Sequence, residues 1–326
     1  MRILLVVASL CLLCSSSAWS AEPVLGWPAD CSLGKDCWIA QYVDHDPTPS
    51  SQDFTCGHLT YDKHTGIDIA LKDRAAISGD VHVLAAADGK VGRIRDSMED
   101  HDGTAEDISA VKAAKKECGN LVSLVHADGW ITEYCHMKKG SVAVRDGQSV
   151  KKGEVLGYVG QSGMAAFAHV HFSLRHRNTD VDPFAGPAFS GCGGKTVPMW
   201  EKEVSYEPVV LYAAGFSGTE PDFDKIVRDA SSVPSLPVSA DKLIFWFMFY
   251  GAEPGDKIHL SILDPSGAVY AEGENLQKKR QARVFRLIGK RTVTAPLKPG
   301  TYKGIATVTR RGLAPRTIEQ TVVIQE

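Results

Sequence analysis

Two histidines one residue apart, His169 and His171, are the side chains best placed to do chemistry in this sequence. In an extended strand the side chains alternate between two faces, so both imidazoles point the same way, roughly 7 Å apart along the strand. Taken alone, such a pair is more often two ordinary strand histidines, because short motifs match frequently by chance. The pair therefore gains meaning only from partners elsewhere in the chain.

Three further residues are candidate partners of this pair. His64 and Asp68 are separated by a spacing that puts both on one face of either a helix or a strand, and His136 ends another predicted strand. Zinc hydrolases take three protein ligands from His and carboxylate residues and keep a fourth position for a water whose pKa falls to about 7. Five such residues suffice for a zinc site, a general base and an oxyanion donor, and the residues alone do not divide these roles.

Short strand-like segments separated by turns surround these residues and must position them. The predicted strands are 81–86, 89–94, 121–126, 130–136, 141–144, 154–159 and 169–174. Asp-Gly and Lys-Gly turns between them favour an antiparallel all-β barrel or sandwich. Residues 96–117 break this pattern with charged and alanine residues, and we expect an insertion there with a surface helix over 108–116.

Six motifs follow one another over about 110 residues of this region. They are His64-x-Gly66-x-Asp68, Val83-x-Ala85-Ala86-x-Asp88-Gly89-x-Val91, Gly119-Asn120-x-Val122-x-x-x-His126-x-Asp128-Gly129, Tyr134-x-His136, Gly147-Gln148-x-Val150-Lys151-x-Gly153 and His169-x-His171-Phe172. In this order they resemble the lysostaphin-type zinc endopeptidases, which cut peptide cross-links in bacterial cell walls. Six ordered matches are far more specific than any single one.

The resemblance implies a fold, a metal and a substrate. It implies a lysostaphin-type antiparallel β-sheet or barrel-sandwich catalytic domain that acts on peptidoglycan. It also implies one Zn²⁺ ion held by His64, Asp68 and His171, with His136 and His169 as catalytic histidines that do not bind the metal.

The sequence departs from the family pattern close to the His-x-His pair. Residues 164–168 replace a usual Ser/Thr-Gly-Pro run, and Val170 replaces a usual leucine. A tyrosine that often precedes the first ligand has no clear match, although His58 and Tyr61 lie nearby. These changes concern the wall of the cleft, and therefore substrate preference, and leave every expected ligand in place.

A chain of 326 residues is too long for one ordinary core and predicts two domains. We expect a signal peptide at 1–20, an irregular cysteine-containing lead-in at 21–57, the zinc peptidase domain at 58–187, a linker at 188–202 and a C-terminal domain at 203–326. The last is predicted to be an immunoglobulin-like β-sandwich with strands at 204–216, 243–250, 257–263, 268–272, 283–288, 301–310 and 317–324, and a helix at 223–230.

The N-terminus predicts export. Arg2 precedes an apolar run, Ile3 to Cys14, that is too short to anchor the mature chain, so we expect no transmembrane segment in it. We expect a periplasmic protein, with the extracellular space as the alternative. Six cysteines remain after the signal, an even number that predicts disulfides in an oxidising compartment. We expect Cys118 to pair with Cys135, and the other four allow three pairings.

The charge distribution adds a second expected partner. A formal net charge of −3 argues against a globally basic nucleic-acid-binding protein. Residues 275–318, however, contain no Asp or Glu and many Lys and Arg residues. A field of one sign concentrates anionic partners, so we expect this part to hold an anionic envelope polymer. The alternative is a basic face that is merely solvated.

These observations predict an exported zinc metalloendopeptidase that hydrolyses cross-links or stem-peptide bonds of peptidoglycan. One alternative is a wall-binding activator of other hydrolases that is not itself catalytic. Another is a biotin- or lipoyl-type carrier, because residues 150–157 are similar to those β-domains. The carrier interpretation leaves the histidines without a role and conflicts with export. The sequence gives no indication of an oligomeric state.

Overall fold

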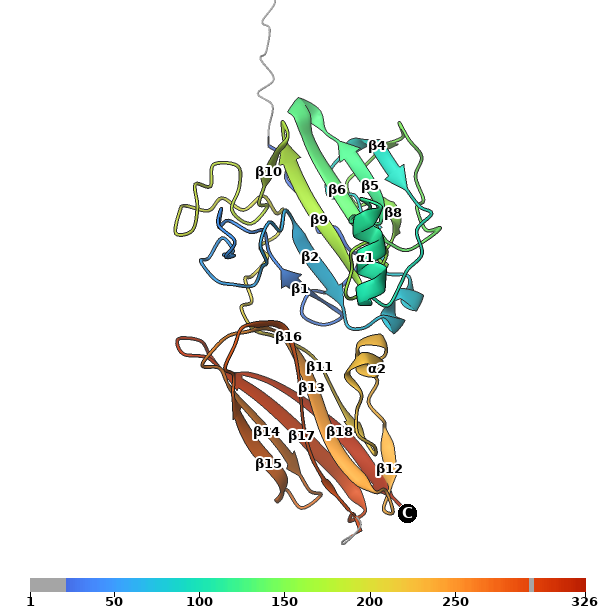
Figure 1. The fold of residues 1–326 in the computed structure, drawn as a ribbon, viewed down its shortest axis with the longest axis vertical. Helices are drawn as coiled ribbons and strands as arrows, with labels where there is room; N and C mark the ends of the chain where they lie inside the picture. Colours follow the sequence, from blue (N-terminus) through green and yellow to red (C-terminus); the bar gives the residue numbers. More distant parts are fainter. Residues whose placement is uncertain (1–21, 293–295) are drawn as a thin grey trace, which may run out of the picture.

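A computed structural model describes residues 22–292 and 296–326 of the chain. The predicted signal peptide, residues 1–20, lies outside the described residues. The chain is mainly β, as predicted, and most of its strand pairs are antiparallel. Figure 1 shows two β-rich parts stacked along the long axis of the molecule, the N-terminal part above the C-terminal part.

The upper part is built on one large sheet of eight strands. Seven of them follow the order β1-β2-β9-β6-β5-β4-β7, and β10 also pairs with β9. Their bounds are β1 Cys37–Gln41, β2 Ile67–Leu71, β4 Gly89–Arg95, β5 Asn120–Val125, β6 Trp130–Met137, β7 Ser149–Val150, β9 His169–His176 and β10 Thr179–Val181. Two further strands, β3 (His82–Leu84) and β8 (Val155–Tyr158), pair separately.

Strand alternation separates the core from the polar residues on β2 and β9. Ile69 pairs with Val170, and both side chains are fully buried in the apolar core. Asp68 pairs directly with His171, and both belong to the opposite face of the sheet. The apolar residues that bury one face therefore hold these polar residues in register on the other.

Three sequence-based expectations for this part are corrected. The lead-in is not wholly irregular, because β1 lies in it, buries all five of its residues and pairs with β2. No strand forms at 141–144, and the short β7 further on closes the sheet edge instead. The insertion does contain a helix, α1 (Ala105–Ala113), but it begins earlier than expected because Thr104 and Asp107 form a capping box.

The lower part consists of two sheets with a common core. One has the order β11-β13-β16 and the other β12-β18-β17-β14-β15. The bounds are β11 Val210–Ser217, β12 Ser235–Pro237, β13 Lys242–Ala252, β14 Lys257–Leu263, β15 Val269–Leu276, β16 Gln281–Arg291, β17 Gly300–Thr309 and β18 Arg316–Gln325, with helix α2 at Phe223–Arg228. Phe245, Phe247 and Phe249 of β13 pack with apolar residues of the second sheet. The immunoglobulin-like topology stays a prediction.

Three disulfides join the six cysteines of the described chain. The expected Cys118–Cys135 bond is confirmed. The other two are Cys31–Cys37 and Cys56–Cys192, the second of which ties residues of the predicted linker to the lead-in. In the part of the chain that the structure describes, we find no helix with the length and hydrophobicity needed to cross a bilayer.

Candidate active site

Three of the five predicted site residues bring one ligand atom each to a single point. His64 Nε2 lies 3.1 Å from Asp68 Oδ1 and 3.1 Å from His171 Nδ1, and the last two atoms are 2.9 Å apart. Zinc bonds of about 2.0–2.2 Å at tetrahedral angles place neighbouring ligand atoms roughly 3.3–3.6 Å apart. The triangle is only slightly tighter than that, so the donor set and its geometry fit a zinc ion.

The ring orientation of His64 is set from outside its own motif. His64 lies in the loop before β2, and its Nδ1 is 2.7 Å from the carbonyl oxygen of Tyr42. A carbonyl can only accept, so Nδ1 carries the proton and donates it. Nε2 is thereby the nitrogen left to face Asp68 and His171, and it can serve as a metal ligand when it carries no proton.

Gly66 is the residue between His64 and Asp68 that leaves room for the second ligand histidine. A Cβ atom at this position would lie 2.4 Å from the carbonyl oxygen of Phe172 and 2.7 Å from Nε2 of His171. Both distances are too short for any real side chain. The central glycine of the His-x-Gly-x-Asp motif is therefore explained by close packing against His171.

The remaining two predicted residues, His136 and His169, flank this triangle. Their rings are 4.5 Å apart, and the His136 ring is 6.1 Å from that of His171. Nδ1 of His136 donates to the carbonyl of Ser162, and Nδ1 of His169 donates to the carbonyl of Phe167, each at 2.8 Å. Each ring therefore keeps Nε2 for other chemistry, and Nε2 of His169 lies 3.6 Å from Asp68 Oδ1.

A break in strand pairing aims His136 at the site. The register between β5 and β6 shifts between Asn120 and Val122, opposite His136. His136 itself has a φ of 61°, in the left-handed region that non-glycine residues rarely adopt. The backbone N–H of His136 donates to the carbonyl of Cys118. The Cys118–Cys135 disulfide links the same two chain segments beside this hydrogen bond. Bulges of this kind commonly redirect a side chain beside an active site.

The electrostatics of the site keep the Asp68 carboxyl ionised among the surrounding imidazoles. Burial alone raises the pKa of the Asp68 carboxyl, but His64, His169 and His171 outweigh it and hold that pKa well below its usual range. Burial lowers the pKa of His64, yet the Asp68 carboxylate reverses the effect and raises it. Burial lowers the pKa of His169, and burial with the neighbouring imidazoles lowers that of His136 further. Both flanking histidines are therefore neutral near pH 7 and able to accept a proton.

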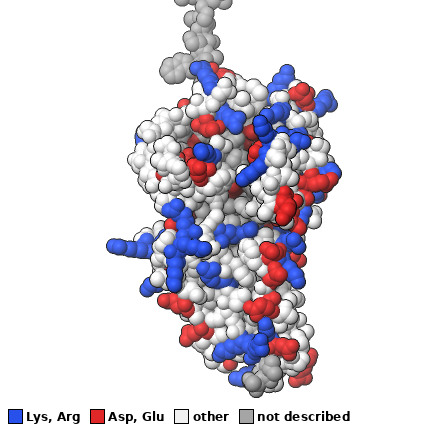
Figure 2. Space-filling view, in the orientation of Figure 1, with Lys and Arg blue, Asp and Glu red and all other residues white. Residues whose placement is uncertain are grey.

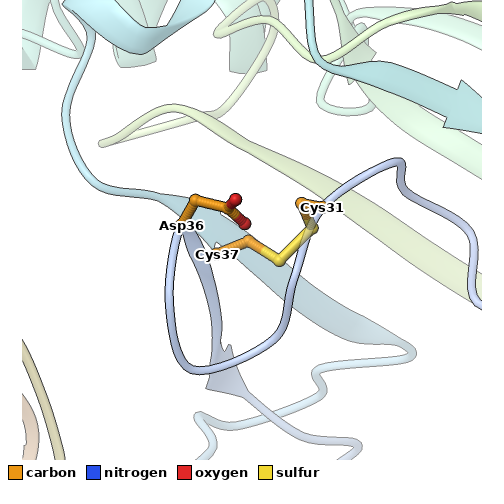
Figure 3. Close-up of side chains that lie close together, drawn as sticks. All are labelled: Cys31, Asp36 and Cys37. Carbon is orange, nitrogen blue, oxygen red and sulfur yellow. A yellow bond between two sulfur atoms is a disulfide. The ribbon is translucent and has the colours of Figure 1, made fainter.

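Two other groups of potential ligands in the described chain do not make metal sites. They are Cys31 with Asp36 and Cys37, and Cys118 with Glu133 and Cys135. In each group the two sulfur atoms form a disulfide, which Figure 3 shows for Cys31 and Cys37 beside Asp36. A disulfide sulfur offers no thiolate to a metal. Of the clusters found among the described residues, the His64, Asp68 and His171 group alone keeps its donors.

Sequence reasoning missed the residues that support the site. The backbone carbonyls of Tyr42, Ser162 and Phe167 fix three imidazoles, and no sequence pattern reports such bonds. His101 of the insertion places Nε2 2.5 Å from the carbonyl of Gly163 and so joins the insertion to the loop before His169. The ring of Tyr61 stacks on His64 at 4.3 Å, and its position just ahead of the first ligand was the only available signal.

Comparison with known proteins gives a family match that spans the site. Residues 62–183 match the family described as Peptidase family M23. This segment contains all five predicted site residues and the strands β2 to β10. The segment 62–183 therefore matches the M23 peptidase domain, which agrees with the lysostaphin type that the sequence motifs indicated.

Curated relatives share parts of this segment. The chain is 45% identical over 64 residues to the cell division protein DipM of Caulobacter vibrioides, which is 20% of this chain and 10% of the relative. It is 28% identical over 165 residues to the uncharacterized lipoprotein YgeR of Escherichia coli, about half of each chain. It is 31% identical over 124 residues to the DD-carboxypeptidase/endopeptidase Mpg of Neisseria gonorrhoeae, 38% of this chain and 23% of the relative. The matched segments thus span between a tenth and about half of these relatives.

Solved structures give weaker matches. The M23 catalytic domain of EnpA from Enterococcus faecalis aligns with a TM-score of 0.30 and 25% identity, over 44% of this chain and 95% of that chain. The catalytic domain of lysostaphin from Staphylococcus simulans aligns with a TM-score of 0.28 and 20% identity, over 44% and 85% of the two chains.

Proposed function

We propose that this protein is an exported zinc metalloendopeptidase that hydrolyses peptide bonds of bacterial peptidoglycan. The observation that carries the proposal is the meeting of His64, Asp68 and His171 at about 3 Å, with the two neutral histidines His136 and His169 beside them. Membership of the segment 62–183 in a peptidase family supports the reaction class. The names of relatives such as Mpg, a DD-carboxypeptidase/endopeptidase, support the substrate class.

His64, Asp68 and His171 would hold the zinc ion, with one ionised carboxylate and two neutral imidazole nitrogens as ligands. When bound, zinc would supply a Lewis acid and a water of lowered pKa. Asp68 is suited to this role because its low pKa keeps it ionised without a proton to displace. His64 is suited to it because the Tyr42 carbonyl holds the Nδ1 proton, so that Nε2 is the nitrogen left for the metal, which would displace any proton there.

The proton transfers would be performed by His136 and His169. Each is neutral, is held by a backbone carbonyl through Nδ1, and presents Nε2 as its only acceptor. Either Nε2 can take the proton of the attacking water, and the imidazolium formed there can then donate a hydrogen bond from Nε2 to the developing oxyanion. Return of the proton to the leaving amine completes the hydrolysis.

Export and the oxidising compartment rest on separate observations. The N-terminal apolar run is typical of a secretory signal. All six remaining cysteines form disulfides, which persist in a periplasm or outside a cell and not in a reducing cytosol. We infer that the mature protein works in the envelope, with direct access to peptidoglycan.

Digestion of purified sacculi tests the proposal. The secreted form, residues 21–326, is expected to contain one zinc per chain and to release muropeptides. A chelator should stop the release, and added Zn²⁺ should restore it. The alternative, a wall-binding activator without catalysis, predicts binding to sacculi with no release under any of these conditions. It also leaves the positioning of His136 and His169 without purpose, which is why we favour hydrolysis.

A further inference from the structure

One face of the β11-β13-β16 sheet packs against the M23 domain. Along β13, Phe245, Phe247 and Phe249 point into the core between the two C-terminal sheets. The alternate residues Trp246, Met248 and Tyr250 instead join the apolar cluster that contains the core of the M23 domain. The C-terminal part is therefore packed against the peptidase domain through a sheet face and not joined to it only by a flexible linker.

The end of this face reaches the residues around His169. The ring of Tyr250 lies 5.8 Å from that of Phe167, and the Phe167 ring lies 4.6 Å from that of His169. The Phe167 carbonyl is also the acceptor that orients His169. Burial raises the pKa of Tyr250, and the nearby Asp68 carboxylate adds to the rise. Strand β13 of the C-terminal part thus contacts, through Tyr250, the residue next to the candidate active site that orients His169.

Arg283 is the charged residue at this end of the face. It pairs with Tyr250 across β13 and β16, so both side chains lie on the same side of the sheet. Its guanidinium carbon stands 5.5 Å from the Phe167 ring and 5.4 Å from the Phe223 ring. Two aromatic faces therefore hold the cation in place while part of the side chain remains accessible.

Arg283, like Arg286 and Arg291 of the same strand, has no acidic partner among the described residues, whereas two other nearby arginines have one. Arg310 is paired with Asp256, and Arg280 with Glu253. Within residues 22–292 and 296–326, no carboxylate lies within 4.0 Å of the Arg283 guanidinium, whose polar neighbours are the phenol groups of Tyr212 and Tyr250. A guanidinium fixed by rings and left without an anion is prepared to bind a carboxylate through two parallel hydrogen bonds.

The side chains around Arg283 add further positive charge. Lys278, Lys279 and Arg280 connect β15 to β16 just before Arg283. Figure 2 shows Lys and Arg gathered across the waist of the molecule, over the end of the lower part that faces the M23 domain. This field would draw an anionic substrate towards the junction of the two parts.

We propose that Arg283 is a specificity-determining residue that binds a carboxylate of the peptide substrate next to the candidate active site. The inference rests on the proposed function. The two ring distances that link the guanidinium to His169 through Phe167 set an upper limit on their separation, and that limit equals the length of roughly three extended residues. The carboxylate therefore belongs to a residue within that reach of the scissile bond. It is either the free C-terminal carboxylate of the peptide or an internal acidic group.

The test uses the full secreted chain and one peptidoglycan-derived peptide in three forms. One form carries both carboxylates, one is amidated at the C-terminus, and one is amidated at the internal acid. The variant Arg283→Met keeps an apolar side chain and removes the charge. Arg291→Met, on the exposed far end of the same strand, is the matched control. Zinc content and Tm are measured for each protein to show that the fold is retained.

We expect Arg283→Met to raise KM for the doubly acidic peptide roughly 10- to 150-fold, the range expected for loss of a charged hydrogen-bonding partner. One amidated form should be equally poor for the wild type and for the variant, and that form identifies which carboxylate is bound. Arg283→Lys should recover part of the affinity, and Arg291→Met should behave as wild type.

An equal effect of Arg283→Met on all three peptides, or no effect, would overturn the inference. Direct calorimetric binding of the same three peptides is measured in parallel. If the wild type hydrolyses none of them, the proposed function fails by itself. The inference then stands or falls on whether Arg283→Met selectively weakens binding of the acidic form.

Discussion

Nε2 of His64 lies 3.1 Å from Nδ1 of His171, although 107 residues separate them in the chain. Two imidazole nitrogens at this distance, with the Asp68 carboxylate against both, form a site whose negative charge and lone pairs suit a metal cation. The arrangement is produced by β2 and β9 pairing in register and by the loop that delivers His64.

Removal of one ligand should strongly weaken zinc binding. In His64→Ala two of the three protein donors remain, and we expect affinity to fall by at least about 100-fold, since loss even of a group supporting a ligand typically costs 10- to 100-fold. His82→Gln is the control, because His82 is a partly exposed histidine of the same domain away from the triangle. Equilibrium dialysis with metal analysis gives both values. Equal zinc content in the two variants would contradict the assigned ligands.

Removal of a flanking histidine should separate metal binding from catalysis. We expect His136→Ala to keep one zinc per chain and to lose about 10²- to 10⁴-fold in the rate of peptide hydrolysis, the usual contribution of a general acid or base. The same holds for His169→Ala. Zinc content and initial rates are measured on the same preparations. A variant that loses zinc as well would assign that residue to the metal.

Gly66 should tolerate no side chain. In Gly66→Ala the new Cβ would meet the Phe172 carbonyl and the His171 ring, so β2 and β9 must shift apart at the metal site. We expect weaker zinc binding and a loss of stability of about 1–3 kcal/mol, as for overpacking elsewhere. Gly79→Ala is the matched control, since a Cβ there meets nothing within 4 Å. If both variants bind zinc as the wild type does, close packing is not the reason for this glycine.

The Cys118–Cys135 disulfide should support both stability and the orientation of His136. Its sequence separation of 17 predicts a loss of about 3 kcal/mol when both cysteines are replaced by serine. Because the bond holds the bulge that aims His136, hydrolysis should fall by more than the unfolded fraction explains. The paired change Cys31→Ser with Cys37→Ser, in the lead-in, serves for comparison. Urea unfolding and specific activity are read together, and unchanged specific activity of the folded protein would exclude the bracing role.

The buried His136 should make the metal-free protein less stable in mild acid. Burial lowers the pKa of His136 well below its ordinary value, whereas the unfolded chain takes up a proton near pH 6.5. Stability from the neutral ring is therefore full above about pH 6.5 and is lost as the pH falls towards the lower folded pKa. Between pH 7.5 and 5.5 the wild type should lose up to about 1.4 kcal/mol more than His136→Gln in urea unfolding with chelator present. The same pH slope in both proteins would be the contrary result.

Much of the site could be predicted because strand alternation and motif order are local properties. The spacing of His169 and His171 sets their common face, and the order of the six motifs brings His64, Asp68 and His136 to the same domain. The structure adds what depends on distant chain segments. The Tyr42 carbonyl that orients His64 comes from the lead-in, next to a strand that its mixed composition did not predict.

The junction between the two parts could not be predicted from the sequence either, because it too depends on contacts between distant chain segments. The basic run at 275–318 suggested an anionic partner but not its place. Only the packing of Tyr250 and Arg283 against Phe167 puts that charge beside His169 and not on a remote face. Phe167, which makes these contacts, belongs to residues 164–168, where the sequence departs from the family pattern.

The most direct test of the account compares zinc-loaded wild type with zinc-loaded His169→Ala in the digestion of purified peptidoglycan sacculi. Both proteins are brought to one zinc per chain, so that only the flanking histidine differs. We predict that wild type releases muropeptides ending in new amino and carboxyl groups and that the variant releases them at least about 100-fold more slowly. Equal release by both proteins, or none by the wild type, would contradict the account.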